Sequence, residues 1–256
     1  MGIDYVKEGR VATFTINRRE ALNALNLETL KQLSEAMMDF RDDPDLWVGI
    51  VTGAGNKAFC VGADVREAVP FIKSGRGLPW AVHPTPMRRL EVYKPLIAAV
   101  NGMALGGGLE VVQICDLRIA SETATFGQPE VKLGLVAGLG GTQRLPRMLP
   151  WCQAAELLLL GKPIDAQEAY RIGLVNKVVP PDQLMPTAKE WAQALCEVGP
   201  VAVRKTKEAM LRGTSMSLDE GLRLENDLSA YSASTEDFAE GTSAFFEKRK
   251  PDFKGK

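Results

Sequence analysis

The chain has 256 residues, of which 45% are hydrophobic and 25% are charged, and its formal net charge at pH 7 is −1. This composition is ordinary for a globular protein with a sizeable core, and it predicts one large domain, or one domain plus a small appendage. The near-zero charge supplies no broad positive field, so it argues against nucleic acid or an anionic membrane as a partner.

The four cysteines lie far apart without a CxxC pair, so a metal or redox motif is not expected and reduced thiols are the better interpretation. The N-terminal stretch carries a charge at Asp4 and lacks the apolar region of a signal peptide. The longest apolar runs, such as "LLLL" at 157–160, are far short of a membrane span. We therefore expect a cytoplasmic protein that uses no metal.

In chain order, residues 3–18 predict two strands around a turn at Glu8-Gly9. A helix follows, with Asn26 as the expected N-cap, because apolar residues then recur along one helical face. The residues of that face are Leu30, Leu33, Met37 and Phe40. Buried strands are expected at 48–53, 95–102, 117–121 and 175–179. Helices between them give the α/β class.

Three segments of this alternation share one organisation. They are "IVTGAGNKAFCVGAD", "IAAVNGMALGGGLE" and "RIASETATFGQPE". Each consists of a strand, an irregular Gly-rich or polar stretch, and a helix start near an acid. This is not a sequence repeat, but it predicts similar turns stacked beside one another.

Only helices are expected from about residue 200 onward. Ser217 and Glu220 form a capping box at the start of one helix, and the last helix covers about 235–248. We divide the chain into a catalytic core, residues 1–199, and a C-terminal helical region, residues 200–256. That region serves either core packing or subunit docking.

The stretch "VGIVTGAGNKA" matches a dinucleotide-binding fingerprint, Gly53-x-Gly55-x-x-Ala58 after a strand. Its context argues against NAD, because the fingerprint must open a helix and "FCVGAD" follows instead. The acid expected about 20 residues later to hold a ribose hydroxyl is also missing from "IKSGRGL".

Two glycine-rich stretches, residues 62–64 and 106–108, can leave backbone N–H groups free for a ligand. Two such donors aimed at one point make an oxyanion hole. Glu110 lies in the first turn of the helix expected near Gly107, and Glu130 lies at the start of another expected helix. Two carboxylates beside an oxyanion hole suit acid–base addition or removal of water next to an activated carbonyl. Alternatively, each glutamate only favours a helix N-terminus.

Five ordered stretches resemble the crotonase superfamily, and most closely its enoyl-CoA hydratases. They are "NRREALNALN" (17–26), "GNKAFCVGADVREA" (55–68), "AAVNGMALGGGLEVVQICDLRIAS" (98–121), "FGQPEVKLGLVAGLGGTQRLPR" (126–147) and "AFFEKRKPDFKGK" (244–256). They are correctly spaced over nearly the whole chain. The resemblance implies a spiral of ββα turns, with C-terminal helices that form homotrimers and usually homohexamers, as pairs of trimers.

The resemblance also implies a role for each site residue. The backbone N–H groups of Ala63 and Gly107 would hold the thioester oxygen of the substrate. Glu110 would polarise the attacking water, and Gly138 would help to position that water. Glu130 would exchange a proton with the α-carbon.

Contacts with CoA are expected from two parts of the chain. Phe245 and Lys248 match family positions that reach the CoA of a neighbouring subunit, and a lysine suits the phosphates of CoA. Lys248 can equally be a solvated surface charge. The other expected substrate or CoA contacts are Arg19, Val61, Ala63, Asp64, Val65, Arg66 and Gly107.

The chain departs from the hydratase pattern at several positions. Hydratases often have Arg-Pro-Lys after the first-motif asparagine, where this chain has a glutamate at Glu20, so a basic CoA contact is lost or taken over by Arg19. Ser229 matches an aromatic residue of the adenine pocket, and Ala137 replaces a common proline. Residues 66–94 match least; this region shapes the acyl pocket in the family, and it contains the only histidine, which we assign to the surface or the pocket lining.

We predict a hydro-lyase that adds water reversibly, with syn geometry, to a trans-2-enoyl-CoA, giving a 3-hydroxyacyl-CoA. It needs no cofactor, because CoA is part of the substrate. One alternative is a sister reaction, either double-bond isomerisation or dehydration of an unusual hydroxyacyl-CoA; isomerases of the family commonly use one glutamate, so the acid pair favours a hydratase. The other is an RNA- or partner-binding protein with a vestigial site, which the near-neutral charge disfavours.

Overall fold

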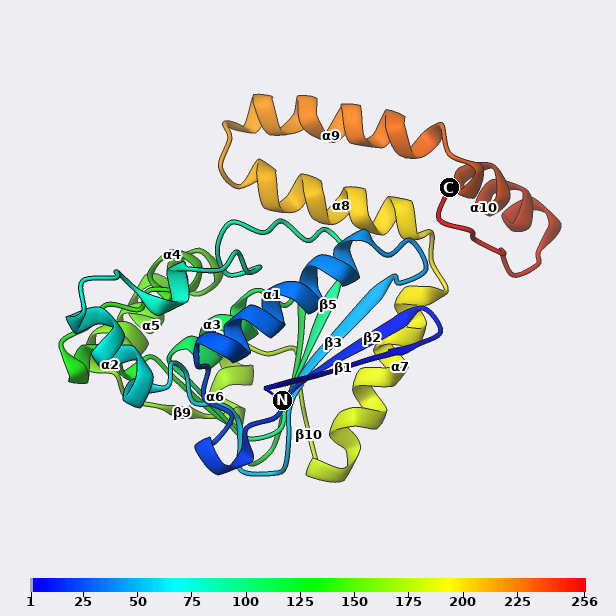
Figure 1. Cartoon of the computed structure of the whole chain (residues 1–256). Coiled ribbons are helices and arrows are strands. Elements are labelled where there is room, and N and C mark those ends of the chain that lie inside the picture. Colours follow the sequence, from blue (N-terminus) through cyan, green and yellow to red (C-terminus); the bar gives the residue numbers. More distant parts are fainter. Residues whose placement is uncertain (1) are drawn as a thin grey trace.

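The computed structural model describes residues 2–256 and contains two β-sheets surrounded by helices (Figure 1). In the larger sheet, β1 and β2 form an antiparallel hairpin and the other neighbours are parallel. Its strands, in spatial order, are β1 (Ile3–Glu8), β2 (Val11–Ile16), β3 (Val48–Gly53), β5 (Leu96–Val100), β7 (Leu117–Ser121) and β10 (Lys177–Val179). The smaller sheet contains β4 (Ala58–Cys60), β6 (Met103–Leu105), β8 (Thr125–Gly127) and β9 (Ile164–Asp165).

Three consecutive turns of the chain lie side by side, as the three similar segments predict. β3, β5 and β7 are parallel neighbours in the larger sheet, and β4, β6 and β8, which follow them, are parallel neighbours in the smaller sheet. The turns then enter α2 (Val65–Lys73), α3 (Gly107–Gln113) and η3 (Pro129–Leu133) respectively. η3 is a short 3₁₀ helix with Pro129 as its first residue and Glu130 as its second, so the helix start expected at Glu130 is present. All three turns reach the same side of the sheets.

Local signals in the sequence explain the first long helix, α1 (Leu27–Asp42). The side chain of Asn26 accepts a hydrogen bond from the backbone nitrogen of Thr29 at 2.9 Å, as an N-cap does. The predicted apolar face is confirmed, because Leu33, Met37 and Phe40 are all fully buried. The side chain of Lys94 closes the other end of α1 by donating to the carbonyl oxygen of Phe40 at 2.6 Å.

The larger sheet is buried on both faces, as parallel sheets usually are. On one face, α7 (Leu184–Cys196) packs on Ile50, Ile97 and neighbouring side chains. The opposite face packs against α1 and the active-site turns, and it includes Phe14 and Val51. Adjacent residues of β3 therefore belong to different cores, and the sheet gives a rigid base for the turns.

The C-terminal helices are confirmed, and they lie outside the two sheets. α8 (Pro200–Gly213) and α9 (Leu218–Ala233) form an antiparallel hairpin, and α10 (Glu236–Glu247) follows at its end (Figure 1). The capping box of Ser217 and Glu220 is present at the start of α9. The remaining helical elements are η1 (Arg19–Ala21), η2 (Pro79–Ala81), α4 (Gly141–Met148), α5 (Trp151–Ala155), the π-helical turn η4 (Glu156–Leu160), α6 (Ala166–Arg171) and η5 (Pro181–Gln183). Within residues 2–256, none of the helices has the length and apolar character needed to cross a membrane.

Candidate active site

A pocket of about 370 Å³ lies where the three stacked turns meet. The first turn supplies Ala63, the second supplies Gly107 and Glu110, and the third supplies Glu130. Gly138, from the loop before α4, also lines the pocket. The structure thus brings together every residue predicted to take part in the chemistry. Apolar side chains complete the wall, among them Val61, Val65, Val69, Ile72, Trp80 and Leu139.

The three consecutive glycines before Glu110 are each required for a different reason. Gly106 has a φ of +55°, and a Cβ there would lie 3.1 Å from Oε1 of Glu130. A Cβ at Gly107 would lie 3.3 Å from Cδ1 of Leu139, and one at Gly108 would overlap the carbonyl oxygen of Cys60. The glycines therefore allow α3 to begin directly beside the pocket.

The two predicted oxyanion donors are free and adjacent. Among residues 2–256, neither the Ala63 nitrogen nor the Gly107 nitrogen donates a hydrogen bond to a protein acceptor. The Ala63 nitrogen is 3.6 Å from the position that a Cβ of Gly107 would occupy. Because Gly107 is the first residue of α3, its N–H also lies at the positive end of the helix dipole. The pair can bind the oxygen of a polarised carbonyl.

Glu110 is buried, with 1% of its surface exposed, and the loop before α4 holds its carboxylate. Oε1 accepts hydrogen bonds from the backbone nitrogens of Leu139 and Gly141, each at 2.7 Å. The pKa of Glu110 is raised, because burial outweighs the lowering effect of these two N–H groups and of the charges of Arg144 and Arg88. The donors fix one oxygen and leave Oε2 for another ligand.

Glu130 is the second carboxylate, and it is suited to carry a proton near neutral pH. Burial, together with the negative charge of Glu110, raises the pKa of Glu130 to about 7. With the Gln128 amide oriented so that all its groups are paired, its nitrogen lies 3.1 Å from both carboxylate oxygens of Glu130, and its oxygen accepts from Gln113. Sequence reasoning missed these two glutamines, because no spacing rule links residues 113 and 128 to Glu130.

An indole closes one side of the pocket beside Gly138. Trp80 is only 8% exposed, and its Nε1 is 2.7 Å from the position that a Cβ of Gly138 would occupy. Trp80 belongs to the weakly matching stretch 66–94, which therefore contributes to the pocket as the resemblance implies. His83, in the same stretch, is half-buried and is not one of the lining residues.

The predicted CoA contacts fall into two groups. Val61, Ala63, Val65 and Gly107 line the pocket, whereas Arg19, Asp64 and Arg66 lie outside it. The Asp64 side chain accepts from the Arg66 nitrogen at 3.2 Å as the N-cap of α2, and it forms a 3.0 Å ion pair with Arg18. It therefore holds the Ala63 loop in place.

Phe245 and Lys248 lie at the C-terminal end of the chain, distant from this pocket. Phe245 is in α10 and Lys248 directly follows it, whereas α2, α3 and α4 are at the opposite side of the molecule (Figure 1). The Phe245 side chain is 78% exposed.

Comparisons with known proteins agree with this geometry. Residues 6–256 match the model of the enoyl-CoA hydratase/isomerase family. The short-chain-enoyl-CoA hydratase of Clostridium acetobutylicum is 47% identical over 246 residues, which cover 95% of this chain and 94% of that protein. The crotonyl-CoA hydratase of Syntrophomonas wolfei is 43% identical over 256 residues, covering 96% and 95%. The crystal structure of an enoyl-CoA hydratase from Bacillus anthracis matches all of both chains, with a TM-score of 0.91 and 38% identity.

This chain therefore belongs to the enoyl-CoA hydratase/isomerase family. Its activity is that of an enoyl-CoA hydratase, a hydro-lyase, which confirms the prediction. The match to solved structures also confirms the crotonase fold.

Proposed function

We propose that the pocket hydrates short trans-2-enoyl-CoA thioesters with Ala63, Gly107, Glu110 and Glu130 as its working groups. One observation carries this assignment: two free backbone N–H groups lie side by side next to one buried carboxylate, Glu110, and one half-buried carboxylate, Glu130. The thioester oxygen accepts from both N–H groups and becomes enolate-like as water adds at C3. The reaction uses only water, the substrate and protein groups, so we propose no cofactor beyond the CoA of the substrate.

In this assignment the two glutamates divide the proton transfers. Oε2 of Glu110 accepts a proton from water while the water oxygen bonds to C3, and Gly138 helps to position the water. Glu130, protonated at the start, gives its proton to the α-carbon. The raised pKa of Glu130 supports its role as the acid, and the two N–H donors to Glu110 support its role as the base. Hydration thus begins with one proton on the two glutamates, held by Glu130, and ends with one proton held by Glu110. The reverse reaction begins with the proton on Glu110 and ends with it on Glu130.

A short acyl chain is supported by two observations. The indole of Trp80, packed on Gly138, closes the pocket beside the reacting groups. Two relatives are named for short-chain and crotonyl substrates. A panel of enoyl-CoAs from crotonyl-CoA to 2-decenoyl-CoA tests the proposal, with loss of the conjugated enoyl absorbance as the readout. A higher kcat/KM for 2-decenoyl-CoA than for crotonyl-CoA would refute the short-chain assignment.

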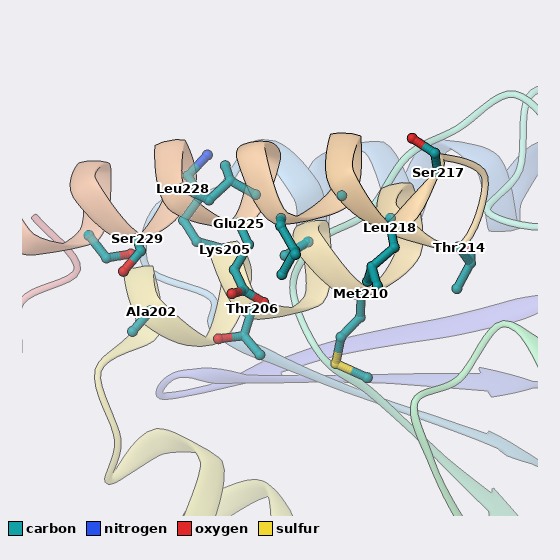
Figure 2. A pocket seen from close by; sticks show the side chains of 15 residues that line it. Ala202, Lys205, Thr206, Met210, Thr214, Ser217, Leu218, Glu225, Leu228 and Ser229 are labelled. Atoms are coloured by element: carbon teal, nitrogen blue, oxygen red, sulfur yellow. The ribbon is translucent and has the colours of Figure 1, made fainter.

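We also propose that residues 200–256 assemble the chain into a homotrimer or a pair of trimers in the cytoplasm. α8 and α9 line a groove of about 590 Å³ between them (Figure 2). Met210 and Leu218, labelled there, are 68% and 77% exposed, which leaves apolar surface for a partner copy. Assembly would also bring Phe245 and Lys248 to a neighbour's CoA. A stable 27.9 kDa monomer in sedimentation velocity would refute this proposal.

A further inference from the structure

Arg144, in α4, connects two segments that border the active site. Its Nη1 donates to the carbonyl oxygen of Leu139 at 2.9 Å, and its Nη2 donates to that of Met87 at 2.9 Å. Leu139 is also one of the two residues whose N–H groups hold Glu110. Met87 belongs to what we call the wall segment, residues 79–90, which includes the pocket residue Trp80. One guanidinium therefore joins the loop that holds Glu110 to the wall of the acyl pocket.

The chain is shaped closely around this guanidinium. Gly140 has a φ of +115°, and a Cβ at that position would overlap Nη1 of Arg144. The backbone nitrogen of Arg144 donates to the Gly140 carbonyl oxygen at 2.8 Å, which starts α4. Met87, on the other side of the bridge, is buried. Leu139 is thus held through both of its backbone groups: its N–H donates to Glu110, and its carbonyl oxygen accepts from Arg144.

The charge of Arg144 also acts on Glu110. The guanidinium of Arg144 donates to three neutral carbonyl oxygens, those of Leu139, Met87 and, at 3.4 Å, Pro86. The acid whose charge acts on Arg144 is Glu110. The charged groups that face Glu110 are Arg144 from α4, Arg88 from the wall segment and Glu130 from η3. The adjacent strands β4 and β6 carry no charged side chain.

We propose that Arg144 is a positioning residue for Glu110, which locks the backbone of Leu139 to the wall segment and places a positive charge near the buried carboxylate. This rests on the proposed role of Glu110 as the group that accepts a proton from water. Loss of the positive charge should make ionisation of Glu110 harder and move the acidic limb of kcat/KM to higher pH. Loss of the bridge should disturb the N–H donor that aims the carboxylate.

Two substitutions separate the charge from the bridge. Arg144→Met removes both, and should lower kcat/KM for crotonyl-CoA roughly 10- to 100-fold and raise the acidic limb by roughly one pH unit. Arg144→Lys keeps the charge but lacks the planar fork that reaches two carbonyls, so kcat/KM should fall while the acidic limb stays at its wild-type pH. Arg147→Met is the matched control, because Arg147 is on the same helix and is exposed. Within residues 2–256 its side chain donates hydrogen bonds to Gln143 alone. It should behave as wild type.

A folded Arg144→Met variant whose acidic limb does not move would overturn the proposal, whatever its rate. If Arg144→Met does not fold, the proposal is tested with Arg144→Lys alone. A wild-type kcat/KM in Arg144→Lys would also overturn the proposal. In a Glu110→Gln background, Arg144→Met should add less than about 3-fold, because the group it acts through is already gone. A full multiplicative loss there would contradict the proposal. Wild-type activity in Glu110→Gln alone would instead show that the proposed role of Glu110 is wrong.

Discussion

Gly62 packs directly against the backbone nitrogen of Gly107, so closely that a Cβ at position 62 would lie 2.9 Å from that nitrogen. Gly62 also has a φ of +94°, which favours glycine. The first turn of the spiral therefore leaves uncovered the oxyanion donor that the second turn provides. The residue beside Gly62 is Ala63, the other proposed donor.

Gly62→Ala should consequently lower kcat by about 100- to 1000-fold, because a methyl group would cover one oxyanion donor. The measurement is crotonyl-CoA hydration, with thermal unfolding followed in parallel. Gly173→Ala is the matched control, since Gly173 has a φ of +79° and its Cβ would meet nothing within 4 Å. It carries similar backbone strain without touching the site. Equal activity in the two variants would contradict the assignment of Gly107.

The two glutamates should differ in a reaction that needs no added water. Glu110→Gln and Glu130→Gln should each lower kcat by about 100- to 10,000-fold, with KM much less affected. Exchange of the α-protons of bound butyryl-CoA with deuterium should fall far more in Glu130→Gln, because that variant lacks the group assigned to the α-carbon. Proton NMR of the recovered thioester measures the exchange. Loss of exchange only in Glu110→Gln would reverse the two roles.

The pH dependence should report the proton shared by this pair. Because the pKa of Glu130 is about 7, kcat/KM for hydration should fall as pH rises above about 7, when that proton is lost. The kcat/KM for the reverse dehydration should fall over the same pH range. Dehydration also needs one proton on the two glutamates, and the overall reaction neither takes up nor releases a proton. Initial rates with crotonyl-CoA and 3-hydroxybutyryl-CoA provide the test. A kcat/KM for hydration that does not fall as pH rises above about 7 would contradict the shared-proton assignment.

Gly138→Ala should narrow the acyl pocket while keeping the backbone N–H at position 138. The new Cβ would be 2.7 Å from Nε1 of Trp80, and the buried indole would have to shift. We expect kcat/KM for 2-decenoyl-CoA to fall about 10-fold more than that for crotonyl-CoA. Adding Trp80→Phe removes the clashing edge and should restore the ratio. An unchanged ratio in Gly138→Ala would show that this wall does not limit chain length.

Much of the fold could be predicted because its signals are local. Asn26 caps α1, Ser217 and Glu220 form their capping box, and the stacked segments form neighbouring turns. The grouping of Glu110 and Glu130 with the glycine-rich stretches was also expected. The residue types alone left open that each acid only favours a helix start, and the resemblance to the crotonase superfamily decided between the two interpretations. The element that holds Glu130 is a helix as expected, although its 3₁₀ type was not predicted.

The supports of the site were not predictable from the sequence, because they are long-range contacts between common groups. Glu110 is held by backbone nitrogens 29 and 31 residues later, and any residue except proline could supply such a donor. The packing of Trp80 on Gly138 likewise joins residues 58 positions apart, without a pattern to reveal it. Such contacts depend on tertiary packing alone.

The stacking of the three turns divides the work of the enzyme among separable parts. The first turn and the segment after it, through residue 90, supply about half of the residues that line the pocket. The second turn contributes the proposed base and the third the proposed acid. Because the sheet strands beneath are joined by their own backbone hydrogen bonds, a lengthened or exchanged loop in the first turn need not disturb the other two. The architecture is thus modular in part: residues 65–78 can be remodelled for new acyl substrates while the proposed acid and base stay unchanged, whereas a change in the wall segment also acts on Glu110 through Arg144.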